Sequence, residues 1–111
     1  MMNIQLFGCL VMCWMLVWPV SVSADEGRDV YMQACAVCHA AGVQGIPGAP
    51  KLGSYTDWST RLVAGRAGLV QSALKGKGAM PPKGGDASLS DMQTKAALDY
   101  MLSKAGVKPK P

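Results

Sequence analysis

The side chains best suited to chemistry lie together in one motif, C-A-V-C-H, which runs from Cys35 to His39. C-x-x-C-H is the recognised signature for covalent attachment of haem. Cys35 and Cys38 are three residues apart, so on a helical turn both thiols project from one side. Each thiol can then add to one haem vinyl group to give a thioether, and the imidazole of His39 can reach the iron. The motif therefore predicts one haem c, with its iron, as the cofactor.

Three other interpretations of the motif compete with haem attachment. A thioredoxin-like redox dithiol requires a βαβ pattern around the motif, and the sequence shows no strand pattern there. A zinc site requires four ligands, but His39 is the only histidine, and the other cysteines, Cys9 and Cys13, lie in a segment predicted to be removed. In the third alternative, Cys35 and Cys38 form a structural disulfide and His39 has no role in the motif. The specificity of C-x-x-C-H favours haem over all three.

The sixth position on the iron decides between two classes of haem protein. Methionine there is typical of an electron carrier, whereas an empty position favours ligand binding or catalysis. Met80 lies in a loop rich in Gly and Pro, and Pro81 and Pro82 stiffen the backbone beside it. We expect Met80 to be the second axial ligand; the alternative is an exposed or packed loop methionine. Core filling is expected for three methionines on predicted helices: Met32, Met92 and Met101.

The N-terminal segment has the pattern of an export signal. Residues 4–22 carry no charge, Pro19 ends the apolar stretch, and Val22 and Ala24 fit the small-x-small pattern of signal peptidase sites. We predict a signal peptide over residues 1–24, cleaved after Ala24, and therefore a periplasmic location in a bacterium. The apolar stretch is close to the ~20 residues that span a bilayer, and no Lys or Arg precedes it. An uncleaved anchor facing the periplasm is therefore the alternative.

The elements that position these residues are predicted to be short helices. Removing the signal peptide leaves 87 of the 111 residues. A domain of this size commonly needs additional stabilisation, for example from a bound cofactor. We expect an all-α domain over residues 25–106, with four to five short helices wrapped around one covalently bound haem, and a flexible tail over 107–111. Hydrophobic spacing and turn residues predict helices at 25–34, 57–64 and 67–74, loops at 41–53 and 76–85, and a last helix capped by Ser88 or Ser90 and closed by Gly106.

Together these features resemble the class I cytochromes c. The similarity rests on Cys35–His39 near the mature N-terminus, on Met80 followed by two prolines, and on a terminal helix that bears Tyr100. The run A-M-P-P-K-G-G at 79–85 is most similar to the bacterial cytochrome c5 group. That group typically carries a second cysteine pair after the methionine loop, and residues 85–88 have none. The resemblance implies the small cytochrome c fold and one-electron transfer, not an enzyme activity.

The resemblance also implies roles for residues outside the motif. Pro50 matches the proline whose carbonyl accepts a hydrogen bond from Nδ1–H of His39, which fixes the imidazole and tunes its basicity. Trp58 is expected either to lie near the haem propionates or to pack in the core. Gly27 would let the first helix approach the last helix closely near Tyr100.

The net charge of the chain and its predicted export indicate which classes of partner to expect. The formal net charge of +4 lies entirely beyond residue 24. The loops expected around the haem hold four lysines that could steer redox partners with acidic docking faces: Lys51, Lys75, Lys77 and Lys83. Nucleic acid is an unexpected partner because the excess charge is modest and the chain is exported. We expect a monohaem carrier in a respiratory or related chain, as a monomer or weak dimer. A haem enzyme or gas sensor with an open sixth site, and a fixed subunit of a larger complex, are the alternatives.

Overall fold

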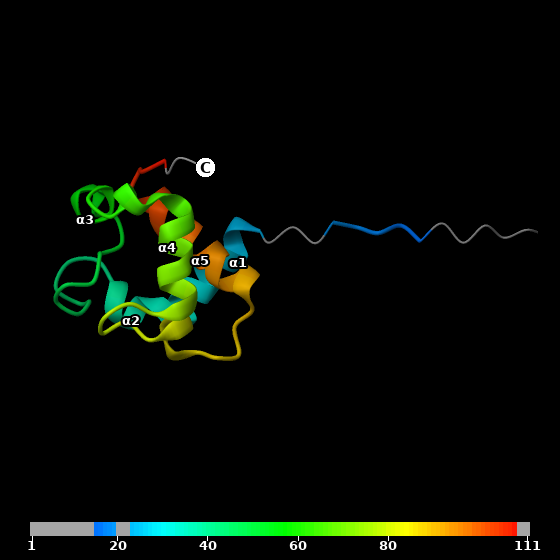
Figure 1. Ribbon diagram of the computed structural model, residues 1–111, viewed down its shortest axis with the longest axis horizontal. Coiled ribbons are helices and arrows are strands. Elements are labelled where there is room, and N and C mark those ends of the chain that lie inside the picture. The colour runs from blue at the N-terminus through cyan, green and yellow to red at the C-terminus, as the bar shows by residue number, and fades with distance from the viewer. Residues whose placement is uncertain (1–14, 20–22, 109–111) are drawn as a thin grey trace, which may run out of the picture.

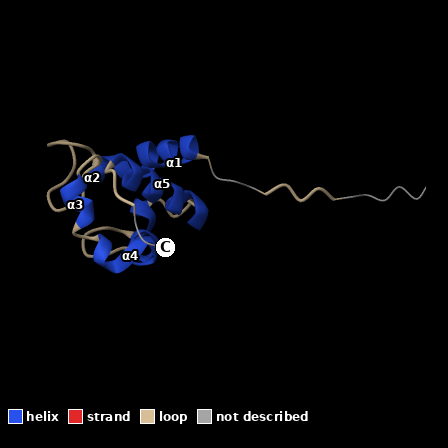
Figure 2. Ribbon diagram, turned by 90° about the horizontal axis from the view of Figure 1, so that it is seen from above, coloured by secondary structure: helices blue, strands red, loops and turns tan. Residues whose placement is uncertain are grey.

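A computed structural model of the protein describes residues 15–19 and 23–108. In those ranges every regular element is helical, apart from one isolated bridge (Figure 2). The all-α prediction is therefore confirmed. Most of the predicted export signal, residues 1–14 and 20–22, and the end of the tail, residues 109–111, lie outside the described residues. Within the described part of the chain, no helix is long and apolar enough to cross a membrane.

One continuous helical stretch carries the C-A-V-C-H motif. It consists of α1 (Ala24–Val30), the π-helical turn η1 (Tyr31–Cys35) and α2 (Ala36–His39) (Figure 1). The Oγ atom of Ser23 caps its start by accepting a hydrogen bond from the backbone N–H of Glu26 at 3.2 Å. The sequence predicted a helix that ends at residue 34. The helix instead continues through the motif by way of the π turn.

The last helix, α5 (Asp91–Lys104), crosses α1. The predicted capping box is confirmed: the backbone N–H of Gln93 donates to Oγ of Ser90 at 3.1 Å, and the backbone N–H of Ser90 donates to Oε1 of Gln93 at 2.9 Å. The two helices approach so closely that a Cβ atom on Gly27 would lie 2.5 Å from the carbonyl oxygen of Ala96. The expected close approach at Gly27 is confirmed, and it requires glycine because the opposing atom belongs to the backbone of α5.

Replacing Gly27 with alanine should therefore destabilise the protein by about 1–3 kcal/mol, the usual range for overpacking. At about 4–8 °C per kcal/mol for a domain of this size, the thermal midpoint of the haem-loaded protein should fall measurably by circular dichroism. Asp29→Ala on the same helix is the control, because Asp29 is exposed and such changes stay within about 0.5 kcal/mol. Equal shifts in the two variants would contradict the close-packing explanation.

The middle of the chain holds two short helical pieces and one longer helix. α3 (Tyr55–Ser59) and the 3₁₀ turn η2 (Leu62–Ala64) replace the single helix predicted for residues 57–64. α4 (Gly65–Lys75) begins two residues earlier than predicted. Gly65 explains the break before α4, because its φ of +67° turns the backbone in a way that other residues rarely adopt. α4 lies in front of α5 in Figure 1 and is joined to it by a two-pronged ion pair between Arg66 and Asp99.

The core forms where α1, η1, α4 and α5 meet. The rings of Tyr31 and Tyr100 pack with centroids 5.3 Å apart. Met101 is buried, as predicted for a core methionine, but Met32 and Met92 are 65% and 49% exposed, so the core prediction was wrong for those two. The π turn shifts the helical phase around Met32, and Met92 lies in the exposed first turn of α5, so hydrophobic spacing did not separate these two from the buried Met101. The buried hydrophobic residues also include Val30, Val70, Leu89, Ala97, Leu98, Leu102 and Val107, the last of which was assigned to the tail.

Candidate functional site

A cavity of about 640 Å³ lies between α2, the loop that follows it, α4 and the loop that follows α4. Its lining includes every predicted site residue except Trp58: Cys35, Cys38, His39, Pro50 and Met80. Apolar side chains and backbone make up most of the remaining wall, and a few polar residues complete it: Thr60, Arg61, Ser72 and Lys77. The fold therefore brings together, on one apolar cavity, residues that are 45 positions apart in the sequence.

The two cysteines line this cavity as free, half-buried thiols. Burial, with a smaller contribution from the nearby Cys38, raises the pKa of Cys35 to about 11. A redox dithiol needs the opposite shift, because its attacking cysteine must be a thiolate near neutral pH. The shift at Cys35 does not favour dithiol exchange, and the site presents two neighbouring thiols to a large apolar space.

The imidazole of His39 is buried and held in one orientation. Its Nδ1 atom lies 2.7 Å from the carbonyl oxygen of Pro50. A carbonyl oxygen only accepts hydrogen bonds, so Nδ1 is the donor, and in the neutral imidazole the lone pair is on Nε2. The backbone is fixed as well: the carbonyl oxygen of His39 accepts from the backbone N–H of Leu52 at 2.8 Å and from the hydroxyl of Tyr31 at 3.4 Å. The site thus presents a preorganised imidazole to a metal.

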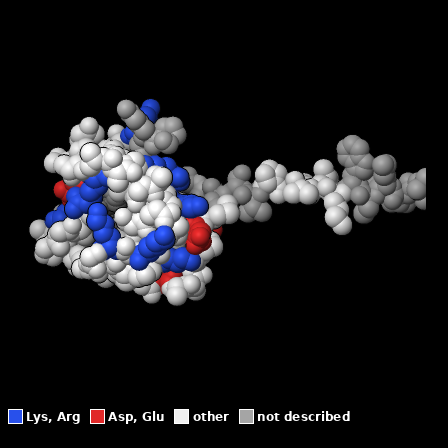
Figure 3. Space-filling model, viewed as in Figure 1, with Lys and Arg blue, Asp and Glu red and all other residues white. Residues whose placement is uncertain are grey.

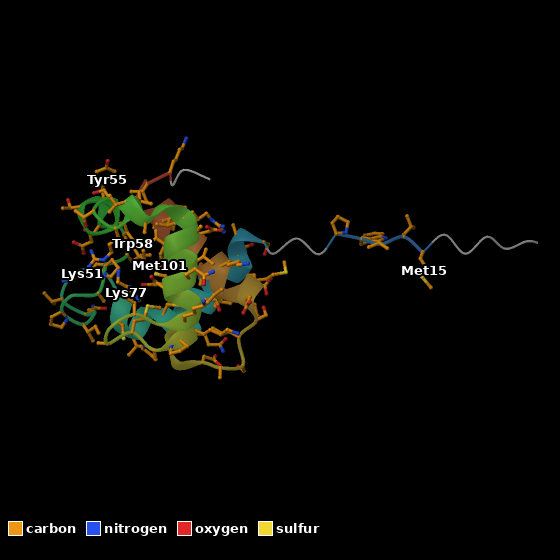
Figure 4. All side chains as sticks on the ribbon, in the orientation of Figure 1. Met15, Lys51, Tyr55, Trp58, Lys77 and Met101 are labelled. Carbon is orange, nitrogen blue, oxygen red and sulfur yellow. The ribbon has the colours of Figure 1, made fainter. Side chains whose placement is uncertain are left out.

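Trp58 lies beside the site but not in its wall. Its ring is buried and stacks on the imidazole of His39, with centroids 6.1 Å apart and planes inclined by 24°. Its indole N–H donates to the carbonyl oxygen of Lys51 at 3.0 Å, and Figure 4 shows Trp58 on the same side of the domain as Lys51. The indole donor is therefore already paired with the backbone. This geometry favours the core-packing role and gives no support to the propionate contact.

The backbone of Met80 is fixed by a tight turn. The backbone N–H of Met80 donates to the carbonyl oxygen of Lys77, and the reverse bond is also made, both at 3.0 Å. Gly76 touches this turn from the end of α4, where a Cβ atom would lie 2.6 Å from the carbonyl oxygen of Met80. Met80 itself is half-buried and lines the cavity. The turn thus brings Met80, whose thioether sulfur is a soft ligand, to the wall of the same cavity as His39.

Three further residues shape the site without having been singled out in the sequence. Gly45 lies against the motif, where a Cβ atom would come within 2.5 Å of the carbonyl oxygen of Cys38. Gly84 has a φ of +64° and faces the carbonyl oxygen of Ala34, 2.7 Å from its would-be Cβ. Arg61 ties the loop after α2 to α3 by donating to backbone carbonyl oxygens of Gly48 and Asp57. The abundance of glycine predicted the loops at 41–53 and 76–85. No local signal in the sequence indicated which glycine packs against which backbone segment.

These donors fit a covalently attached haem. The cavity offers an imidazole nitrogen and a thioether sulfur, which is the ligand pair of electron-carrying c-type haem, together with two thiols for the vinyl groups. A zinc site fits less well, since the described residues contain no group of three or more His, Cys, Asp or Glu side chains that could hold a metal ion.

Comparison with known proteins agrees with this arrangement. The family model described as "Cytochrome C oxidase, cbb3-type, subunit III" matches residues 22–101. The chain is 40% identical to cytochrome c-555 of Chlorobaculum tepidum over 86 residues, which cover 74% of this chain and 77% of that protein. The chain belongs to the class I c-type cytochromes. Within them it is similar to the c5 group, being 42% identical to cytochrome c5 of Azotobacter vinelandii over 80 residues, which cover 70% of this chain and 93% of that protein.

A solved structure shows the same fold for this cytochrome. It is the crystal structure of an electron transfer complex of nitrite reductase with cytochrome c, and the matching chain is 44% identical, with a TM-score of 0.64 over 72% of this chain and 94% of that one. Membership of this family means that the protein carries one covalently bound haem c with its iron, and that it is an electron carrier and not an enzyme.

Proposed function

We propose that this cytochrome is an exported monohaem one-electron carrier of a respiratory or related chain. In this proposal Cys35 and Cys38 form the thioethers, and His39 and Met80 are the axial ligands of the iron. The observation that carries the proposal is the shared cavity, which all four residues line. When bound, the haem iron supplies a couple between Fe(III) and Fe(II).

The residues of the chain set the properties of that couple. The carbonyl oxygen of Pro50 keeps the proton on Nδ1 of His39 and so presents Nε2 as the ligand. The soft sulfur of Met80 favours the reduced state, and the apolar wall disfavours the extra charge of the oxidised state. Both effects raise the reduction potential. Because the backbones of His39 and Met80 are held by hydrogen bonds, little rearrangement is needed when an electron arrives or leaves.

Basic residues around the cavity favour partners with acidic docking faces. Lys77 and Arg61 are exposed and line the cavity, and Lys75 is exposed at the end of α4. Figure 3 shows Lys and Arg side chains spread over the face that carries α4 and the neighbouring loops, with few acidic ones among them. Lys83 does not belong to this set, because its ammonium group is engaged with α5. We propose that this basic face, formed by Lys51, Arg61, Lys75 and Lys77, meets the acidic partner.

A salt titration tests the docking proposal. The reduced cytochrome is mixed with a nitrite reductase, the class of partner seen with its structural relative, and the second-order oxidation rate is measured as ionic strength rises. Steering by opposite charge should make the rate fall about tenfold or more, since it contributes ~10–10³ to association rates. Lys77→Glu should lower the rate at low salt, and Lys104→Glu on α5, which lines no part of the cavity, should leave it nearly unchanged. A second-order oxidation rate that does not change with ionic strength would contradict docking through the basic face.

Location and assembly belong to the same proposal. The segment before α1 supports export to the periplasm, with a monomer or weak dimer as the working state. A fixed subunit of a larger complex is the second candidate, because the matching family model is described as an oxidase subunit. Gel filtration of a native extract separates the two: a free carrier elutes at the size of the chain alone, and a subunit elutes with its complex.

A further inference from the structure

Lys83 adopts a backbone conformation that lysine rarely takes. Its φ and ψ are +54° and +33°, and it is the one non-glycine residue with a positive φ among residues 15–19 and 23–108. This left-handed region is disfavoured for residues with a Cβ atom. Such a conformation persists only where the surrounding structure fixes it, and it is found disproportionately at functional sites.

The side chain of Lys83 supplies the contacts that fix it. Its Nζ atom donates to the carbonyl oxygen of Leu89 at 2.7 Å and forms an ion pair with Oδ1 of Asp91 at 3.2 Å. The side chain is only 24% exposed, although lysine side chains are mostly solvated. Asp91 is the first residue of α5. Lys83 therefore ties the loop after Met80 to the start of the last helix.

The rest of this loop is also attached to the fold. Gly84 lies against the carbonyl oxygen of Ala34. The carboxylate of Asp86 accepts hydrogen bonds from the side chain and backbone of Ser88 and from Nε2 of Gln33 at 3.2 Å. These bonds, those from Ser88 first, hold the pKa of Asp86 below its ordinary value. Ala34 and Gln33 belong to η1, so the loop is joined to the helical turn that leads into the haem-binding motif.

Only two prolines separate Lys83 from Met80. The ring of each proline fixes φ near −65°, so Pro81 and Pro82 leave few torsions that could absorb a movement of Lys83. On the other side, Met80 is held by its paired hydrogen bonds with Lys77. Met80 thus stands between two fixed points, and Lys83 is the anchor on the C-terminal side.

We propose that Lys83 is a positioning residue that holds the sulfur of Met80 on the haem iron. The inference rests on the proposed ligation by Met80. Loss of the ammonium contacts releases the loop, and the strained backbone at Lys83 then relaxes toward ordinary conformations and carries Met80 away from the cavity. Lys83 does not line the cavity, so its effect is on how often Met80 is displaced.

Imidazole binding to the oxidised, haem-loaded protein tests this role. Imidazole must displace Met80, so its apparent dissociation constant reports how tightly the loop holds the sulfur. Lys83→Met removes the ammonium group and keeps a side chain of similar length. It should lower the imidazole dissociation constant about tenfold, the order expected for one charge-assisted hydrogen bond, and weaken the far-red sulfur–iron band. Lys83→Arg, which can donate to the same two oxygens, should restore both readouts.

Controls separate this role from general stability and from net charge. Lys104→Met removes one exposed positive charge far along α5 and should leave imidazole affinity unchanged. If Lys83→Met does not assemble with haem, Lys83→Gly replaces it, because glycine loses the anchor but accepts the positive φ; it should lower the dissociation constant at least about threefold.

The outcomes distinguish this inference from the proposed function. An unchanged imidazole affinity in the assembled Lys83 variant, with a normal far-red band in the wild-type protein, would overturn the role of Lys83 alone. Absence of that band in the wild-type protein, with the same imidazole affinity in Met80→Ala, would instead overturn the ligation by Met80. A tenfold gain in imidazole affinity in Lys83→Met, with wild-type affinity restored in Lys83→Arg, supports the positioning role.

Discussion

Replacing Met80 with alanine should abolish the far-red sulfur–iron band of the oxidised protein and lower its reduction potential by on the order of 100 mV. Axial ligands move haem potentials over a range of about 0.8 V, and a methionine sulfur raises the potential by favouring the reduced state. The turn that fixes the backbone of Met80 places its side chain in the cavity wall with His39. Loss of the thioether therefore removes the ligand without removing the rest of the site.

The control for this variant is Met92→Ala. Met92 lies on α5, is 49% exposed and does not line the cavity, so both the band and the potential should stay at their wild-type values. Spectra are recorded in the oxidised and reduced states, and the potential is obtained by redox titration. A Met80 variant with a wild-type spectrum and potential would show that the sixth position is not filled by this sulfur, and it would favour a ligand-binding haem protein.

Replacing both Cys35 and Cys38 with serine should eliminate covalent haem. The double variant should release all its haem on denaturing extraction, whereas each single variant should retain haem through one thioether. Because the thioethers join the cofactor to the chain as crosslinks do, we expect a loss of stability comparable to the ~2–4 kcal/mol that a disulfide typically contributes, which is about 8–32 °C in the thermal midpoint.

Val37→Ala is the matched control for the cysteine variants. Val37 lies between the two cysteines on α2 and is 75% exposed, so its replacement leaves both thiols and their spacing unchanged. Haem should then stay attached after extraction. Covalent haem in the double serine variant would mean that attachment occurs elsewhere in the chain.

Much of the candidate site could be predicted from the sequence because it depends on local spacing. The C-A-V-C-H motif encodes two thiols and an imidazole within five residues, and the fold places all three on one cavity. Met80 was identified by its unusual loop, where prolines and glycines leave no packing reason for a methionine. The capping box at Ser90 was also local, and its two hydrogen bonds are present.

What the sequence missed depends on contacts between distant segments. The π turn at Tyr31–Cys35 changes the helical phase, so the expected burial of Met32 did not follow. The partner of the Trp58 indole is a backbone carbonyl seven residues away, which no pattern of side chains indicates. Lys83 was grouped with the docking lysines because a loop lysine is usually solvated. Its ammonium group instead meets α5, and only the fold brings those atoms together.

An optical spectrum of the purified protein, oxidised and then reduced and repeated after denaturing extraction, tests the central claim most directly. The account predicts sharp c-type bands on reduction, a weak far-red sulfur–iron band in the oxidised native protein, and haem that stays with the chain through extraction. That result would establish covalent haem with methionine ligation at the cavity formed by His39 and Met80. A chain that retains no haem after extraction would contradict the account and return Cys35 and Cys38 to a dithiol or disulfide role.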